Sequence, residues 1–215
     1  MDKNHKLLFH GAKSRIEGKL DIHKSRTNND LGQGFYTGER YEQAISFISG
    51  FEKSSVYIFD FKEEGLKGKK YNVNQEWMMT IAYYRGALEE YENHPIIKKL
   101  IEKSCDCDYI IAPIADNRMF QIINSFIMGE ITDEQCKHCL AATNLGYQYV
   151  FKSDKAIKSL KMLERCYISE KEKEYAWFSY AAKIIRAGCN DQQMSGYTVT
   201  GTGIDGQEIK AELTN

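Results

Sequence analysis

The sequence predicts an α+β fold, and three observations lead to this prediction. Short apolar and aromatic runs, typical of strands, alternate irregularly with helical patterns and do not follow the regular order of a doubly wound sheet. The 215 residues are 42% hydrophobic and 27% charged, which is the composition of a globular chain with room for one domain and an appendage. No proline-rich or serine-rich linker divides the sequence, so we expect one continuous domain.

The first half of the chain is expected to hold three strands and three helices. Residues 6–10 (KLLFH) form an apolar run that stops at Gly11, and a long polar loop then continues to Asp30. A second segment, residues 31–38 (LGQGFYTG), is a turn entering a strand. The other expected elements are a helix over residues 41–48 from its apolar spacing, a strand at 56–61, a helix at 75–90, and a short helix opened by Pro95.

The second half shows strand patterns at residues 109–114 and 147–151 and several helix signals. The helix signals are the apolar face Phe120, Ile123 and Ile127; a capping box of Thr132 and Gln135 for a helix reaching Ala142; and Ser153 as cap of a helix through Met162. A further helix begins at Ser169 and Glu172, presents Tyr175, Phe178, Ala182 and Ile185, and ends at Gly188.

These elements divide the chain into three parts. We expect a domain over residues 5–163, an added helix over 164–189, and a polar tail over 190–215 that is either a mobile extension or a loosely attached hairpin. We assign no activity to the tail.

Charge and hydropathy exclude several classes of protein. No apolar run approaches the ~20 residues that cross a bilayer, so we expect no membrane partner. The start, MDKNHKLLFHG, lacks the apolar stretch of a secretory signal, which predicts a cytoplasmic protein with reduced cysteines. The net charge of −1 gives no overall attraction to nucleic acid, so any basic surface is local.

Familiar nucleotide and hydrolase motifs are absent from the sequence. Gly32-Gln33-Gly34 lacks the third glycine of a dinucleotide-binding turn, and residues 65–70 (GLKGKK) lack P-loop spacing and are expected to form a solvated turn. Neither a GxSxG nor an HExxH motif occurs.

Several cysteines and one histidine have a spacing that suggests a zinc site. Its candidate ligands would be Cys105, Cys107, Cys136, His138 and Cys139. Cys136 and Cys139 lie inside an expected helix, however, where small cysteines commonly pack in the core. We therefore expect no metal.

Three short segments, distant in the sequence, each place a polar or aromatic residue of possible function in or beside a strand. They are FHGA at residues 9–12, GQGFYT at 32–37 and YQYVF at 147–151. Singly, His10 is compatible with a strand-end histidine, Tyr36 with a core aromatic residue, and Gln148 with an exposed strand position. Their order and chemistry together are more informative.

Together these segments resemble the ADP-ribosyltransferase superfamily, in the branch of the ADP-ribose polymerases and the diphtheria-type toxins, which share a His-Tyr-Glu signature. FHGA matches the histidine strand, GQGFYTG the tyrosine strand, and YQYVF the strand that carries glutamate. With DLGQGFYT, a Trp77 helix bearing Arg85, and YIIAPIADNRMF, residues 7–163 are similar to the bacterial family called domain of unknown function 3990. The resemblance implies a split antiparallel sheet with several surrounding helices.

The resemblance also implies a function. It predicts an NAD-dependent mono-ADP-ribosyltransferase, of a class that includes bacterial toxins and defence enzymes, which releases nicotinamide and modifies a protein or a nucleic acid. An antitoxin or other cognate partner follows from the habits of such families. The alternatives are a catalytically silent domain that binds NAD, a nucleotide or a partner, and a purely structural interaction module.

Site roles follow by matching residues to the signature. His10 would bind a ribose hydroxyl of the adenosine half, the backbone of Gly11 would approach the nicotinamide carboxamide, and Tyr36 would stack on the nicotinamide ring. Gln148 would stand in place of the glutamate. The loop glycines Gly32 and Gly34 and the strand residues Phe35 and Thr37 would complete the NAD-binding set.

Gln148 is the main departure from the signature. An amide accepts a hydrogen bond but cannot take up a proton, so elongation to a polymer is disfavoured and single transfer needs a strong nucleophile or another carboxylate. Asp116 is the candidate carboxylate, with an N-cap as the alternative reading. Arg118 is expected to contact phosphate or to form a surface salt bridge, and Asp30 is interpreted as a turn residue.

The loop over residues 13–26 carries five positive and two negative residues, a local charge of +3. Its cations are Lys13, Arg15, Lys19, Lys24 and Arg26. Such a loop could meet a pyrophosphate or a nucleic acid, and a plain solvated loop is the alternative.

Overall fold

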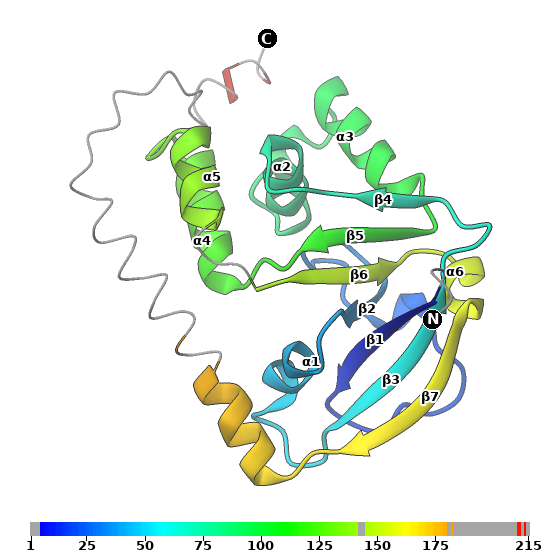
Figure 1. Cartoon of the computed structure of the whole chain (residues 1–215). Coiled ribbons are helices and arrows are strands. Elements are labelled where there is room, and N and C mark those ends of the chain that lie inside the picture. The colour runs from blue at the N-terminus through cyan, green and yellow to red at the C-terminus, as the bar shows by residue number, and fades with distance from the viewer. Residues whose placement is uncertain (1–4, 142–144, 180–181, 183–209, 212, 214–215) are drawn as a thin grey trace.

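The computed structural model describes residues 5–141, 145–179, 182, 210–211 and 213 (Figure 1). The described chain is α+β, as predicted, and its strands form one sheet in the order β4-β5-β6-β2-β1-β3-β7. The strands are β1 (His5–Ala12), β2 (Phe35–Gly38), β3 (Ser55–Lys62), β4 (Gly68–Lys70), β5 (Tyr109–Pro113), β6 (Tyr147–Phe151) and β7 (Leu160–Tyr167). The expected antiparallel sheet is in fact mixed, because β4 runs parallel to β5.

The predicted capping residues begin several of the helices. The α-helices are α1 (Tyr41–Ile48), α2 (Gln75–Tyr84), α3 (Pro95–Cys105), α4 (Asn117–Ile127), α5 (Asp133–Ala141) and α6 (Asp154–Lys158), and residues 170–179 are also helical. Two 3₁₀ turns, η1 (Ile22–Lys24) and η2 (Glu89–Tyr91), complete the set. Thr132 and Gln135 form the expected capping box, and Ser153 accepts a hydrogen bond from the backbone of Ala156. In the part of the chain that is described, no helix has the length and apolarity to cross a membrane.

The sheet is split between β1 and β2. These neighbours pair at one position, Phe9 with Gly38, whereas β2 pairs with β6 along its whole length and β1 pairs with β3 along its whole length. The two halves diverge from this point, as Figure 1 shows. An opening between adjacent strands is therefore built into the middle of the sheet.

Helices and the 13–34 loop cover the two halves. The largest cluster of buried residues packs α2, α4 and α5 against β5 and β6, and it includes Trp77, Ile110, Phe126 and Val150. A second cluster contains the aromatic residues Phe35, Phe59, Phe61 and Phe151, with Ile16 and Leu20 of the long loop packed against it. The loop thus has an apolar anchor on the sheet although most of its other residues are charged or polar.

Three expectations about secondary structure were wrong. Residues 68–70 form strand β4 rather than a turn, paired with β5 at the sheet edge. The helix expected to reach residue 90 ends at Tyr84, because Gly86 has a φ of 87°. The helix expected to run through Met162 ends at Lys158, and β7 follows and pairs with β3, so the expected domain boundary at residue 163 falls inside a strand.

The added C-terminal helix begins as predicted but packs through different residues. Ser169 and Glu172 hydrogen-bond reciprocally at its start. Tyr175 and Phe178, expected on the packed face, are 74% and 65% exposed, while Lys173 and Ala176 are buried. The described Ala182 is also exposed, and the expected Ile185, the terminator Gly188 and most of the tail lie outside the described residues.

Candidate functional site

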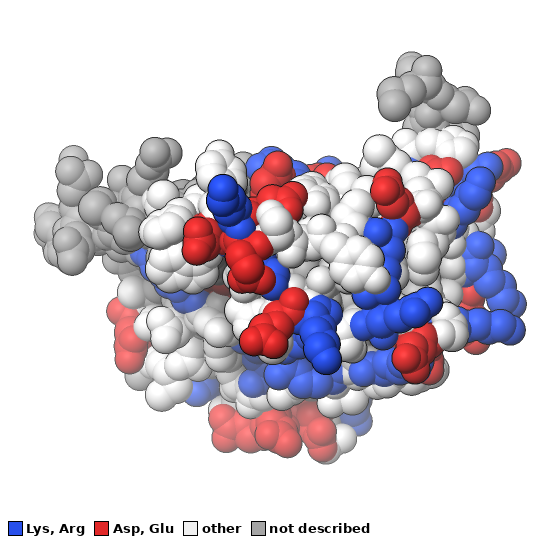
Figure 2. All heavy atoms as spheres, turned by 90° about the horizontal axis from the view of Figure 1, so that it is seen from below, with Lys and Arg blue, Asp and Glu red and all other residues white. Residues whose placement is uncertain are grey.

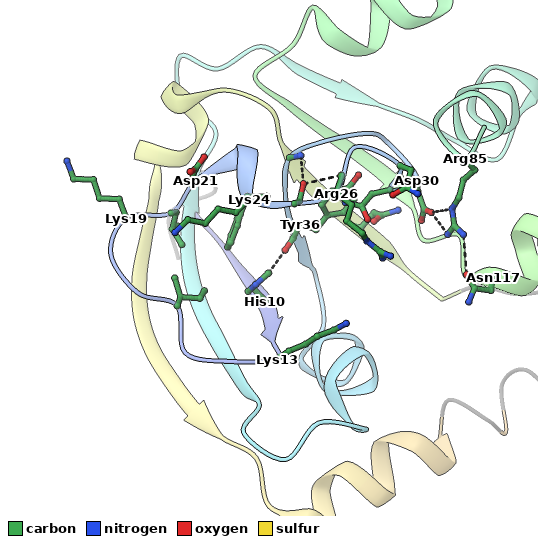
Figure 3. A pocket seen from close by; sticks show the side chains of 18 residues that line it. His10, Lys13, Lys19, Asp21, Lys24, Arg26, Asp30, Tyr36, Arg85 and Asn117 are labelled. Atoms are coloured by element: carbon green, nitrogen blue, oxygen red, sulfur yellow. Dashed lines mark hydrogen bonds and ion pairs between the residues drawn. The ribbon is translucent and has the colours of Figure 1, made fainter. Parts of the chain in front are cut away.

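A cavity of about 730 Å³ lies at the split in the sheet. Its walls come from β1, the 13–34 loop, β2, α2, the start of α4, and β6. His10, Tyr36 and Gln148, each from a different strand, all line it. Figure 3 shows His10 with Lys13, Lys19 and Lys24 on one side and the group of Asp30, Arg85 and Asn117 on the other, with Arg26 between them.

The cavity reaches both faces of β2. Successive strand residues point to opposite faces, and accordingly Phe35 belongs to the aromatic cluster while Tyr36 packs against the cluster that contains Trp77. Both residues line the cavity. This is possible because β1 does not pair with this part of β2.

His10 is held in one orientation. Its Nδ1 lies 2.6 Å from the carbonyl oxygen of Tyr36, and its ring stacks on Phe35 with centroids 4.5 Å apart. Burial lowers the pKa of His10, and the carbonyl of Tyr36 opposes this by favouring the protonated ring. Because a carbonyl only accepts, Nδ1 carries the hydrogen, and in the neutral ring Nε2 is an acceptor.

Tyr36 is tied to the glycine-rich loop before it. Its hydroxyl donates to the carbonyl of Gly32 at 2.6 Å and accepts from the backbone N–H of Leu31 at 3.2 Å. Burial raises the pKa of Tyr36, so the hydroxyl stays protonated. Gly32 has a φ of 73°, and a Cβ there would lie 2.5 Å from the ring of Tyr84, so no larger residue fits the loop as it stands.

Lys152 fastens the same loop to the end of β6. Its Nζ donates to the carbonyls of Leu31 at 2.8 Å and Gln33 at 2.7 Å. Burial lowers the pKa of Lys152. The sequence analysis did not identify this residue, because its partners lie about 120 positions away.

The other glycines and Thr37 have mainly structural roles. A Cβ at Gly11 would lie 2.3 Å from the carbonyl oxygen of Ala44, so this glycine lets α1 pack closely on β1. Gly34 lines the cavity, and a Cβ there would lie 2.7 Å from the carbonyl oxygen of Phe151. Thr37 is buried and donates to the carbonyl of Tyr149 at 3.4 Å.

Gln148 is buried beside a carboxylate. Its Nε2 donates to the carbonyl of Pro113 at 3.2 Å, and its side chain lies near enough to Asp30 to lower the pKa of that carboxyl group. Asp30 accepts from Nε of Arg85 at 2.8 Å and from Nη2 of the same side chain. Asp30 is therefore not merely a turn residue, since it supplies a carboxylate to the cavity.

Burial raises the pKa of Asp30, and contacts with Arg85 and Gln148 partly offset the rise. Arg85 is itself fixed, because its Nη1 donates to Asn117 Oδ1 at 3.1 Å and its guanidinium lies 5.0 Å from the ring centre of Phe120. No local motif marks this group, because Asp30 and Arg85 are separated by 55 positions.

Asp116 and Arg118, the other candidates, lie at the start of α4. Asp116 Oδ1 accepts from the backbone N–H of Met119 at 2.8 Å, which makes it the N-cap that was the alternative reading. Asn117, between them, is the residue of this turn that lines the cavity. Asp116 is still near enough to Asp30 to raise its pKa.

The positively charged loop over residues 13–26 forms one wall of the cavity. Its cavity-lining residues are Lys13, Ile16, Lys19, Leu20, Asp21, Lys24, Ser25 and Arg26, and Arg15 lines an adjoining groove that also contains Gly11. The backbone N–H of Ile16 donates to the hydroxyl of Tyr57 at 2.8 Å, which fixes the loop to β3. Figure 2 shows that Lys and Arg side chains lie among Asp and Glu side chains on the face seen from below.

Among the described residues, no group of three or more His, Cys, Asp or Glu side chains is arranged to hold a metal ion. Cys136 is buried in α5, and its Sγ lies 3.8 Å from the carbonyl oxygen of Ile122. Burial raises the pKa of Cys136 to about 12, so its thiol stays protonated.

Comparison with known proteins identifies one family. The family model described as "Protein of unknown function (DUF3990)" matches residues 7–162, which is most of the chain and runs from within β1 to the start of β7. No curated protein and no solved structure matches the chain.

Proposed function

This chain belongs to the DUF3990 family of proteins of unknown function, and from that premise we propose that its cavity performs NAD-dependent mono-ADP-ribosyl transfer. The reaction would break the bond between nicotinamide and its ribose and transfer ADP-ribose to a protein or a nucleic acid. The observation that carries the proposal is the meeting of His10, Tyr36 and Gln148 on one cavity, although they lie far apart in the sequence.

The hydrogen-bonding state of each residue suits this substrate. His10 uses Nδ1 on the backbone, so Nε2 can accept from a ribose hydroxyl. The amide nitrogen of Gln148 already donates to Pro113, so its oxygen can accept from the hydroxyl of the second ribose. Tyr36, fixed by its hydroxyl, offers a ring face to the cationic nicotinamide.

The volume of the cavity and the positive charge of its lining also support the binding of a dinucleotide. A volume of about 730 Å³ lies within the range of small-molecule sites. Lys13, Lys24 and Arg26 line the cavity and could bind a diphosphate. The division of the sheet at β1 and β2 agrees with the split sheet that the ADP-ribosyltransferase resemblance implies.

The test is incubation of the purified protein with NAD labelled in the adenylate part, in the presence of whole-cell lysate. We expect label on macromolecules, and its removal by protease or by nuclease identifies the acceptor class. A protein carrying both His10→Ala and Tyr36→Ala is the matched control and should transfer no label. Equal labelling by this double variant would contradict the proposal.

Gln148 favours a second candidate, a silent domain that binds NAD or a nucleotide without cleaving it. An amide cannot take the proton of an incoming nucleophile. This candidate predicts that NAD raises the melting temperature while no nicotinamide is released. The two functions therefore differ in one measurable product.

A further inference from the structure

The cavity contains a carboxylate that the His-Tyr-Glu signature does not predict. The side chain of Asp30 is 12% exposed and lines the same cavity as His10, Tyr36 and Gln148. It lies in the loop before β2, near enough to Gln148 for that side chain to lower its pKa. Asp30 thus places an ionisable oxygen beside the position where the signature has glutamate and this chain has an amide.

The contacts of Asp30 leave one oxygen outside its ion pair. Nε and Nη2 of Arg85 both approach Oδ1, so Oδ2 takes no part in the contact with the guanidinium. Arg85 is held in turn by Asn117 and lies over Phe120. The carboxylate is therefore oriented by a fixed partner at the C-terminal end of α2, as a proton-accepting group needs to be.

We propose that Asp30 is the catalytic base of this site, that Gln148 binds the ribose without taking a proton, and that Arg85 is a positioning residue. The inference rests on the proposed transferase function. In the step, the bond between C1′ of the ribose and the nicotinamide nitrogen breaks, and its electron pair leaves with nicotinamide. A lone pair of the acceptor forms the new bond to C1′, and the acceptor proton passes to Oδ2 of Asp30.

The surroundings of Asp30 raise its pKa above the ordinary value for aspartate. Burial raises its pKa, Asp116 raises it further, and Arg85 and Gln148 lower it. Tyr36, a titratable group that interacts with Asp30, stays neutral because burial raises its own pKa. A base whose pKa lies above the ordinary carboxyl range accepts a proton more readily, provided that it is still ionised at the working pH.

Three variants test the proposal. Asp30→Asn keeps the size and one acceptor for Arg85 but cannot take a proton, so we expect transfer to fall by about 100-fold or more. The rise in melting temperature on adding NAD should persist. Asp30→Glu should recover part of the activity. Glu130→Gln, at an exposed carboxylate that does not line the cavity, should retain activity within a few-fold of the unmodified protein.

The dependence of the transfer rate on pH provides a second test. A purely structural role for Asp30 would not change the shape of this pH profile. Transfer by the unmodified protein should fall as pH is lowered through the pKa of Asp30, because only the carboxylate accepts the proton. In Asp30→Asn this acidic limb should disappear from the residual activity. If Asp30→Asn fails to bind NAD, the pH profile of the unmodified protein becomes the test of the proposal. The absence of an acidic limb from that profile overturns the proposal.

The outcomes separate this proposal from the one on which it rests. If the unmodified protein transfers ADP-ribose and Asp30→Asn transfers it equally well, Asp30 is not the base and the transferase function stands. If the unmodified protein releases no nicotinamide with any acceptor fraction, the transferase function itself fails, and the role of Asp30 fails with it.

Discussion

The side chain of His10 bridges the split in the sheet by donating from Nδ1 to the carbonyl oxygen of Tyr36, at 2.6 Å. At this position β1 and β2 have already diverged, so the imidazole replaces a strand-to-strand contact. The same bond fixes the tautomer and directs Nε2 elsewhere. One residue therefore links the structure of the split to the chemistry proposed for the cavity.

His10 should make stability depend on pH. Its folded pKa is below the ordinary value of 6.5, so the unfolded chain binds more protons between the two values. The free energy of unfolding should therefore fall as pH is lowered through about 6.5 towards the folded pKa. Urea unfolding at several pH values measures this change in the free energy of unfolding. In His10→Asn this dependence should be weaker, and an unchanged pH dependence would contradict the assignment.

Gly32→Ala should destabilise the protein and disturb the cavity. The left-handed backbone costs alanine about 1–2 kcal/mol, and the new Cβ would lie 2.5 Å from the ring of Tyr84. Gly50→Ala is the matched control, because a Cβ there meets nothing within 4 Å. Denaturant unfolding of both variants should show a loss in the first that exceeds the loss in the second.

Lys152→Met should loosen the loop that carries Leu31 and Gln33. Two hydrogen bonds from a partly buried ammonium group are lost, and each such bond contributes about 1.5–3 kcal/mol. We expect lower stability and a smaller shift in melting temperature with NAD. Lys158→Met, at an exposed lysine on the following helix, is the control and should change neither quantity appreciably.

Gln148→Glu should not increase the rate of ADP-ribosyl transfer. It places a second carboxylate beside Asp30, and two such groups in one buried site raise the pKa of one of them. We expect the acidic limb of the pH–rate profile to move to higher pH and the rate at neutral pH to fall or stay unchanged. A large gain in transfer at neutral pH would show that position 148, rather than Asp30, needs the carboxylate.

Much of the fold could be predicted because its signals are local. Asp116, Ser153 and the pair Thr132 and Gln135 cap helices as the sequence indicates, and the apolar periodicity of residues 41–48 forms α1. The resemblance to known signature motifs then indicated which strands meet at the cavity.

The two strands at the edges of the sheet, β4 and β7, have no local sequence pattern that predicts a strand. Residues 68–70 of β4 are glycine and lysine, and pairing with β5 alone makes them a strand. Strand β7 has the sequence LKMLERCY, rich in helix formers, but the free edge of β3 pairs with it. Here tertiary pairing overrides local preference.

The group around Asp30 was missed for a related reason. Its partner Arg85 follows directly after α2 and its neighbour Gln148 lies in β6, and no spacing within one segment connects them. Asp30 stands next to the glycine-rich loop, in a position that is typical of a turn. Only the folded chain shows that its side chain faces the cavity.

The most direct test of the central claim is nicotinamide release from NAD, followed by chromatography, for the unmodified protein and for His10→Ala, with lysate as the source of acceptor. The account predicts release by the unmodified protein and its loss in the variant, while circular dichroism shows both to be folded. Release that is equal in both, or absent from both while NAD still raises the melting temperature, would contradict the claim that this cavity cleaves NAD.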